Sequence, residues 1–215
     1  RGGRSVTKDV VGPFVGAKAP VGPGDPVGGH RCITDGVNHP DAAACPGSGG
    51  AEVQALLRFD SLFGSGNNQI PYGSTITSAT LRVGQYADGA SSATASVRRM
   101  LVSWNASSNW SSMTTSGLGI QNDNVEASAV ADSSFSGLTT SGTRTFTGPA
   151  LTTSLQAWAD GQPNLGWALS QDNANAWRVR TSEDSSLSNR PMLTVTYKAP
   201  TATTTMTGAG VTVAV

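Results

Sequence analysis

The residues best suited to chemistry are two cysteines and two histidines near the N-terminus. Cys32 and Cys45 are the only cysteines, and His30 and His39 are the only histidines. Two Cys and two His are a common ligand count for zinc, although their order and spacing here match no zinc-finger pattern. Twelve residues separate the cysteines, and a disulfide closing such a loop contributes about 3 kcal/mol in the chain-entropy model. We predict a disulfide between Cys32 and Cys45, with zinc as the alternative.

The same segment places two aspartates beside a histidine, which are residue types found in hydrolytic sites. These are Asp35, His39 and Asp41. A hydrolase also needs a nucleophile or a second carboxylate at a working distance, and the sequence contains no recognisable motif for either. We interpret the three residues as part of a polar loop and predict that the protein is not an enzyme.

Acidic residues farther along the chain supply the hard oxygen ligands that calcium prefers. The candidate ligands are Asp123, Asp172, Glu183 and Asp184. Their spacing does not follow an EF-hand loop. The sequence therefore leaves two readings open. One is a structural calcium ion bound by loops, and the other is a set of solvated acids in which Glu183 pairs with Arg180 or Arg190.

Aromatic residues outside the regular patterns are candidates for sugar binding, because exposed rings can stack on pyranose rings. We single out Trp110 and Trp177, with Tyr72 and Tyr86 as further candidates. Only 6% of the residues are aromatic, so a core of this size needs most of them. Sugar binding is therefore the weaker of two functional readings.

The elements that must position these residues are mostly strands. Alternation of apolar and polar residues has the period of a half-buried strand. It predicts strands over residues 53–59, 76–86, 97–104, 143–146, 165–170, 177–180 and 192–197. The last three read as one terminal antiparallel meander. Pro191 starts its final strand, because proline donates no ladder hydrogen bond.

One stretch has the period of a helix instead. Leu151, Leu155 and Trp158 recur at i, i+4 and i+7, which places them on one helical face. Pro149 suits the first turn of a helix, and Gly161 suits the residue that ends one. We predict one short helix that caps an end of the fold and buries Trp158.

Several of these stretches, taken in order, resemble the DNRLRE domain family. The pieces are LLRFD at 56–60, IPYGSTITSATLRV at 70–83, LVSW at 101–104, TTSLQAWADG at 152–161, and NLGWAL, TSED and NRPMLTVTY between 164 and 197. The family consists of secreted bacterial and archaeal β-sandwich domains similar to some carbohydrate-binding modules. The resemblance implies a jelly-roll-like fold, an extracellular or cell-surface location in a prokaryote, and a binding or structural role. It implies no catalytic residues.

We therefore predict an all-β, jelly-roll-like antiparallel β-sandwich with one short helix and extended terminal segments. Residues 1–50 are expected to form a Gly/Pro-rich extended segment with the disulfide loop, 51–197 the sandwich, and 198–215 a β-prone extension. The expected core residues are Phe59, Leu81, Trp104, Trp158, Trp167, Leu169, Leu193 and Val195.

The composition narrows the range of partners. Charged residues make up 13% of the chain and the formal net charge is zero, against about 25% charged residues in a typical domain. A basic patch for nucleic acid is therefore not expected. No run of 18 apolar residues exists to cross a membrane. The chain begins at Arg1 without a methionine, from which we expect an upstream segment to have been removed.

Both ends of the chain are β-prone and are separated from the central domain by Pro or Gly. The N-terminal candidate is residues 6–15, and the C-terminal one is residues 201–215, where Val211, Val213 and Val215 alternate with smaller residues. We expect one of them to add as a strand to a neighbouring subunit. The rival reading is a strand that folds back on its own sheet, or, at the N-terminus, a short first strand followed by a loop.

The function that follows from these expectations is structural. We predict a subunit of an extracellular surface or matrix filament, assembled by strand exchange between β-sandwich domains, because head-to-tail donation does not close on itself unless the rotation does. The alternative is a non-catalytic carbohydrate-binding module of a secreted protein, with a polysaccharide as its partner.

Overall fold

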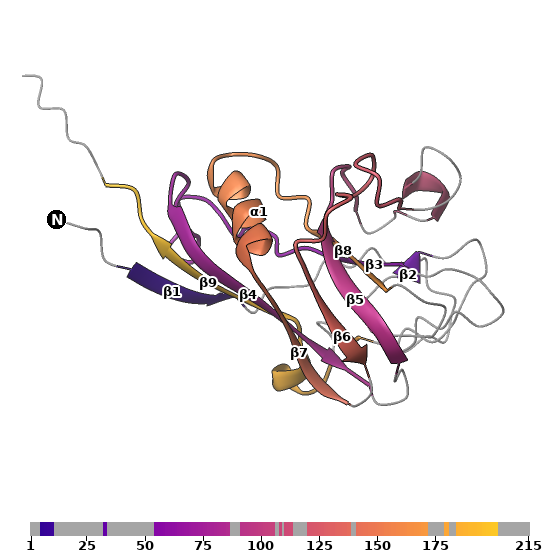
Figure 1. The fold of residues 1–215 in the computed structure, drawn as a ribbon. Coiled ribbons are helices and arrows are strands. Elements are labelled where there is room, and N and C mark those ends of the chain that lie inside the picture. Colours follow the sequence, from indigo (N-terminus) through magenta and orange to yellow (C-terminus); the bar gives the residue numbers. More distant parts are fainter. Residues whose placement is uncertain are drawn as a thin grey trace, which may run out of the picture.

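The fold was obtained as a computed structural model that describes residues 5–10, 32–33, 54–86, 91–105, 108, 110–113, 120–138, 141–171, 179–180 and 184–201. These residues form two antiparallel sheets that pack face to face, with one α-helix beside them (Figure 1). The predicted all-β sandwich with one short helix is confirmed. The disulfide partner Cys45 and the C-terminal residues Val211, Val213 and Val215 lie outside the described residues, so both expectations remain predictions.

The first sheet has four strands and the second has five. The four-stranded sheet has the order β1 (Ser5–Val10), β9 (Met192–Lys198), β4 (Thr75–Gln85) and β7 (Gly142–Thr147). The five-stranded sheet has the order β2 (Cys32–Ile33), β3 (Gln54–Leu57), β8 (Trp167–Gln171), β5 (Ser91–Arg99) and β6 (Ser133–Leu138). Two short 3₁₀ helices, η2 (Trp110–Met113) and η3 (Leu187–Asn189), lie in the connections.

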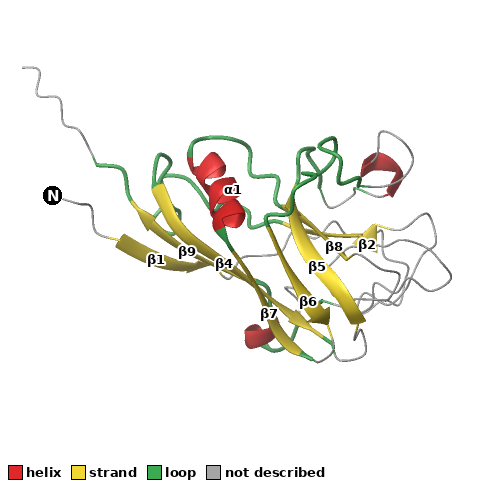
Figure 2. Cartoon of the chain, in the orientation of Figure 1, coloured by secondary structure: helices red, strands yellow, loops and turns green. Residues whose placement is uncertain are grey.

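The helix α1 (Pro149–Ala159) has the bounds that its sequence predicts, and Figure 2 shows it beside the start of β4. Pro149 occupies its first turn, where no intrahelical amide donor is needed. Gly161, with a φ of 98°, follows its end in a conformation that other residues rarely adopt. Leu155 and Trp158 are buried as expected, so α1 is held by its apolar face.

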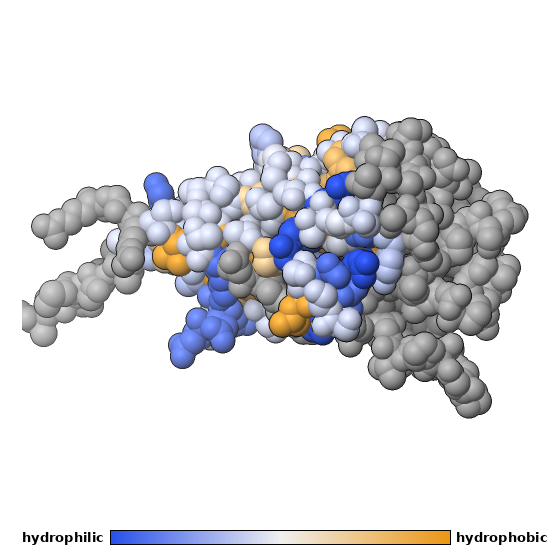
Figure 3. Space-filling model, turned by 90° about the horizontal axis from the view of Figure 1, so that it is seen from below, coloured by the Kyte–Doolittle hydropathy of each residue, from blue (hydrophilic) through white to orange (hydrophobic). Residues whose placement is uncertain are grey.

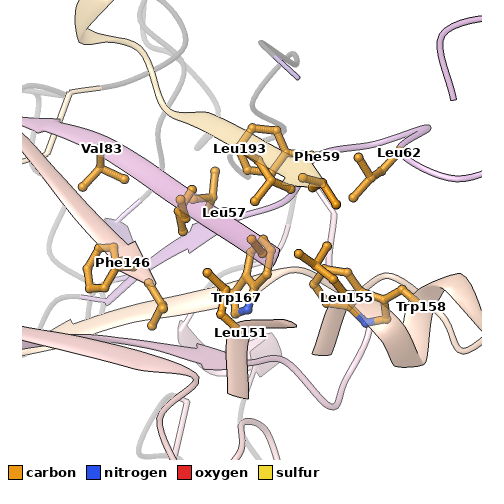
Figure 4. Packing of buried hydrophobic residues seen from close by; sticks show 14 of the residues in the cluster. Leu57, Phe59, Leu62, Val83, Phe146, Leu151, Leu155, Trp158, Trp167 and Leu193 are labelled. Atoms are coloured by element: carbon orange, nitrogen blue, oxygen red, sulfur yellow. The ribbon is translucent and has the colours of Figure 1, made fainter. Parts of the chain in front are cut away.

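The main core lies between the two sheets and under α1 (Figure 4). All eight residues expected in the core are buried. The rings of Trp158 on α1 and Trp167 on β8 meet with centroids 4.7 Å apart and an interplanar angle of 60°. Each large side chain that is fully buried stabilises the fold by roughly 1.5–3 kcal/mol before entropy is counted. Two tryptophans on consecutive elements thus join the helix to the five-stranded sheet.

A second apolar cluster lies on the other face of the five-stranded sheet. It consists of Leu56, Met100, Trp104, Met113, Ile120, Ala127 and Ala168. Leu56 and Ala168 come from β3 and β8, whose alternate residues Leu57 and Leu169 enter the main core. Both faces of β3 are therefore buried. The long polar tract after Trp104 contributes a small core of its own, in addition to strand β6.

The predicted strand over 97–104 is displaced in the structure. Strand β5 ends at Arg99, and Trp104 lies in the loop that follows. Trp104 is nevertheless buried, because its Nε1 donates to the Leu165 carbonyl at 2.6 Å and the Arg58 guanidinium lies 4.6 Å from its ring. Trp104 and Val102 therefore pack as part of a loop over the sheet, whereas Leu101 is exposed, and none of the three extends the β5 ladder.

The predicted terminal meander is wrong, because β8 and β9 belong to different sheets. The chain has already changed sheets by Val179, which forms an isolated bridge with Gln85 at the end of β4. The amide of Arg180 also donates to the Gly84 carbonyl at 2.8 Å. Of the strand predicted over 177–180, only Val179 and Arg180 are described, and they continue the line of β9 along β4.

Candidate functional site

The N-terminal strand β1 forms one margin of the four-stranded sheet. It pairs antiparallel with β9 through six residue pairs, from Ser5 with Lys198 to Val10 with Leu193. We call the part of β9 that it covers, residues 193–198, the β9 edge. The hydroxyls of Thr7 and Thr196 lie 3.2 Å apart across this pairing. The short first strand expected as one reading of the N-terminus is thus present, and it pairs within its own chain.

Strand β1 is held by its backbone more than by its side chains. Ser5, Val6 and Thr7 are exposed, with Val6 39% accessible. Neither apolar cluster includes a residue of β1 whose side chain the structure describes. The facing residue of Val6 is Tyr197, which is only 8% accessible and belongs to the main core. The β9 edge therefore carries core residues, while the β1 side chains that the structure describes add little to them.

Lys8 occupies a position that an apolar residue would fill in a buried strand. Lys8 pairs with Val195, so both side chains lie on the same face of the sheet. Because Val195 belongs to the main core, this is the inner face. Its side chain is half-buried. A charged residue on the inner face of a marginal strand is one of the features by which natural sheets discourage further strands from adding.

A different margin of this sheet is covered by the helix. Strand β7 pairs with β4 only from Thr80 onward, which leaves the start of β4 without a strand on that side. There the Gln156 side chain accepts from the Ile76 amide at 2.8 Å and donates to the Ser74 carbonyl at 3.0 Å. The Gly73 amide donates to the Ala159 carbonyl at 2.8 Å. Helix α1 thus substitutes for a neighbouring strand.

The sandwich is also joined where β6 and β7 meet. The Ser133 hydroxyl donates to the Thr147 carbonyl at 2.7 Å and accepts from the Thr147 amide at 3.0 Å. This side chain links the margins of the two sheets at one point. Among the described residues, β1 is held by its backbone pairing with β9 and by the hydroxyl contact between Thr7 and Thr196.

One buried carboxyl group lies between the sheets and the helix. Asp132 is 8% accessible and accepts from Trp167 Nε1 at 2.8 Å, and its amide donates to the Val97 carbonyl at 2.8 Å. Burial raises the pKa of Asp132, while hydrogen bonds from Ser154 and Trp167 and the charge of Arg99 partly oppose the rise. These contacts join β5, β8 and α1, so the group's evident role is to position them.

The acidic residues predicted as calcium ligands do not come together among the described residues. Asp123 accepts from the Val125 amide at 2.9 Å in an exposed turn. Asp184 pairs with Arg180 at 2.7 Å. Asp172 and Glu183 lie outside the described residues. In the part of the chain that the structure describes, no group of three or more His, Cys, Asp and Glu is close enough to hold a metal ion.

Asp184 instead organises the loop before β9. Its carboxylate also accepts from the Ser186 amide at 2.9 Å and from Asn189 Nδ2 at 3.2 Å. Burial alone would raise the pKa of Asp184, but these bonds and the Arg180 guanidinium lower it below its ordinary value. Arg180 in turn lies 4.0 Å from the centroid of the Tyr86 ring. The loop is therefore fixed against the end of β4.

The aromatic residues predicted to bind sugar are divided by the structure. Trp110 begins η2, but its ring, like the whole of Trp177, lies outside what the structure describes. Tyr86 has one face covered by Arg180. Tyr72 is 57% accessible and stacks against Phe63 with centroids 6.1 Å apart. Tyr72 is thus the candidate whose ring is demonstrably exposed.

The described surface carries few strong features. In Figure 3 most of it is pale, with small separate blue and orange areas, as a chain with 13% charged residues would give. The sequence analysis did not identify the structural roles of Gln156 and Asp132. Gln156 binds the backbone at the margin of β4, and Asp132 binds Trp167 at the centre of the sandwich. Neither has a local signal, because a polar residue on a helix or before a strand is ordinarily solvated.

Comparison with known proteins leaves the family open. No protein-family model matches this chain, and no curated protein matches it significantly in sequence. Among the described residues, no helix is both long enough and apolar enough to cross a membrane.

Proposed function

We propose that this chain is an extracellular structural subunit whose copies join into a filament by exchanging a terminal strand. The observation that carries the proposal is β1. A strand from the end of the chain covers the β9 edge through six backbone pairs, while its described side chains remain exposed or half-buried. Backbone pairing does not depend on which copy supplies the strand. The low charge and the resemblance to secreted β-sandwich domains support the extracellular location.

Strand exchange gives polymers through simple geometry. Each copy offers one terminal strand and one β9 edge, so the contact joins two different surfaces. Such a heterologous contact continues from copy to copy unless the rotation between neighbours closes a ring. A filament held in this way keeps the six residue pairs of each strand, now formed between copies.

The test is the state of the complete purified chain. Electron microscopy and light scattering over a range of protein concentrations are expected to show filaments that lengthen as concentration rises. A matched variant that lacks residues 202–215 tests the other terminus, since the C-terminal segment is the second candidate donor. Single particles at every concentration, for a chain whose circular dichroism is that of a β-protein, would contradict the proposal.

A carbohydrate-binding module is the second candidate, and the exposed Tyr72 favours it. Replacing Tyr72, Trp110 or Trp177 by Ala is then expected to weaken retention on an insoluble polysaccharide without lowering the melting temperature, because a stacking ring works through its exposed face. Leu187→Ala is the control, since Leu187 is 67% accessible and not aromatic. Equal retention of all four variants would contradict sugar binding.

A further inference from the structure

We infer that β1 is the strand exchanged, and that β1 of one copy covers the β9 edge of the next in the same register as it does within one chain. This inference rests on the proposed function and names the partner surface for it. The partner is a second copy of this chain. The two surfaces that would meet are already complementary, because β1 and β9 pair within one chain from Ser5 with Lys198 to Val10 with Leu193.

The first argument is the cost of removing β1. Withdrawing this strand exposes Tyr197 and Val195 of the β9 edge, but three of the four β1 side chains that the structure describes give up little buried surface, since Ser5, Val6 and Thr7 are exposed where they are. The lost interactions are the backbone ladder and the hydroxyl contact between Thr7 and Thr196. All of them form again with a second copy, so exchange changes the connection between strands and not their contacts.

The second argument is the length of the connection. Residues 11–31 separate β1 from β2, and ten of these 21 residues are Gly or Pro. A chain of that length spans up to about 70 Å when fully extended, which exceeds the width of a sandwich domain. Gly and Pro disfavour helix and ladder over such a stretch. The connector is therefore long enough to place β1 on a neighbouring copy.

The third argument concerns the competing way to polymerise. A strand could also add to the outer side of β1, but Lys8 points toward the inner face of the sheet there, and charge in this position opposes edge-to-edge association. The start of β4 is covered by Gln156. These two margins therefore favour polymerisation in which β1 is replaced by β1 of another copy over polymerisation in which a strand adds beyond β1.

The experiment uses the Thr7 and Thr196 pair in the complete chain. Thr7→Cys and Thr196→Cys are prepared separately, unfolded, mixed and refolded, and then treated with a short thiol crosslinker. We expect a crosslinked dimer on denaturing gels whose linking peptide contains both positions. The control mixture pairs Thr7→Cys with Thr145→Cys, an exposed residue on β7, which pairs with β4 and not with β1, and it is expected to give no such peptide. The unsubstituted chain shows the background from Cys32 and Cys45.

A chain with both substitutions separates this inference from the proposed function. A ladder of dimers, trimers and larger species supports exchange of β1 within a filament. Filaments seen by microscopy together with crosslinks only inside single chains would contradict exchange of β1 but would still support the proposed filament. A ladder that stops at dimers supports exchange of β1 as a reciprocal pair and overturns the filament. Neither filaments nor links between chains overturns both.

Discussion

Asp132 shows how one buried carboxyl group can couple stability to pH. Its folded-state pKa is raised by burial, so the folded state binds the proton more tightly than the unfolded state does. The stabilisation from this difference is complete below the unfolded-state pKa and is lost as the pH rises through the folded-state pKa. The carboxyl group therefore makes the fold less stable toward neutral pH than an uncharged side chain of the same shape would.

We predict that Asp132→Asn removes this component of the pH dependence. The amide keeps an oxygen that can accept from Trp167 Nε1, so urea unfolding at several pH values should show a smaller loss of stability above the acidic range. Asp132→Ala is the contrasting variant. It leaves the buried indole N–H without this acceptor and should lower the free energy of unfolding by about 1–3 kcal/mol at all pH values. An unchanged pH dependence in Asp132→Asn would contradict the assignment.

Gly84 marks the close approach between β4 and the loop before β9. A Cβ at this position would lie 2.4 Å from the Asn189 carbonyl oxygen and 3.0 Å from Arg180 Cδ. We predict that Gly84→Ala displaces this loop and lowers the free energy of unfolding by about 1–3 kcal/mol, as overpacking commonly does. Thr143→Ala, at the exposed residue that pairs with Gly84, is the control. A Gly84→Ala variant as stable as the control would contradict the close approach.

At the scale of elements, Gln156 tests whether a helix can close the margin of a sheet. We predict that Gln156→Ala leaves the Ile76 amide and the Ser74 carbonyl without their side-chain partners and costs about 1–3 kcal/mol of stability. Gln156→Glu keeps an acceptor for the Ile76 amide, but it places a carboxylate oxygen against the Ser74 carbonyl and the Asp160 carboxylate, to which Gln156 Nε2 donates. Its cost at neutral pH should therefore be at least as large as that of Gln156→Ala. Thermal unfolding of the three proteins measures the order. Equal stability of all three would contradict this role of α1.

The elements also show what the sequence could predict. Alternating residues such as Leu193 and Val195 identify a strand and its buried face, and Leu151 with Trp158 identifies a helix, because these patterns are local. Sheet membership is not local. Strands β8 and β9 follow one another in sequence with the spacing of a meander, yet they lie in different sheets. Only the packing of Val179 against β4 decides between these arrangements.

The same limit applied to the candidate site. The first strand could be anticipated from its β-prone residues, but its register against β9 could not. Leu56 lies between Gln54 and Arg58 in the alternation of its strand, and it is buried because the loop after Trp104 packs over that face. Gln156 had no signal at all, since its role depends on a strand 80 residues away in sequence.

At the scale of the whole molecule, the proposed exchange of β1 predicts that folding and assembly can be separated. We predict that a chain lacking residues 1–10 still folds, because the described side chains of β1 lie outside both apolar clusters. Its melting temperature should be lower than that of the full chain, because Tyr197 and Val195 lose their cover and six residue pairs are lost. Assembly should be lost, and a peptide with the sequence SVTKDV should bind the truncated chain in solution. Filaments of normal length from the truncated chain would contradict the role of β1.

The direction of the ladder in β1 and β9 sets how an exchanged strand would respond to tension. Hydrogen bonds in an antiparallel pair lie perpendicular to the strands. In a filament, tension that runs along β1 from its Val10 end would load all six residue pairs at once. A pull applied at right angles would break the pairs one after another. A joint between β1 and β9 would therefore resist tension along the strand, in shear, better than tension that peels the strand away.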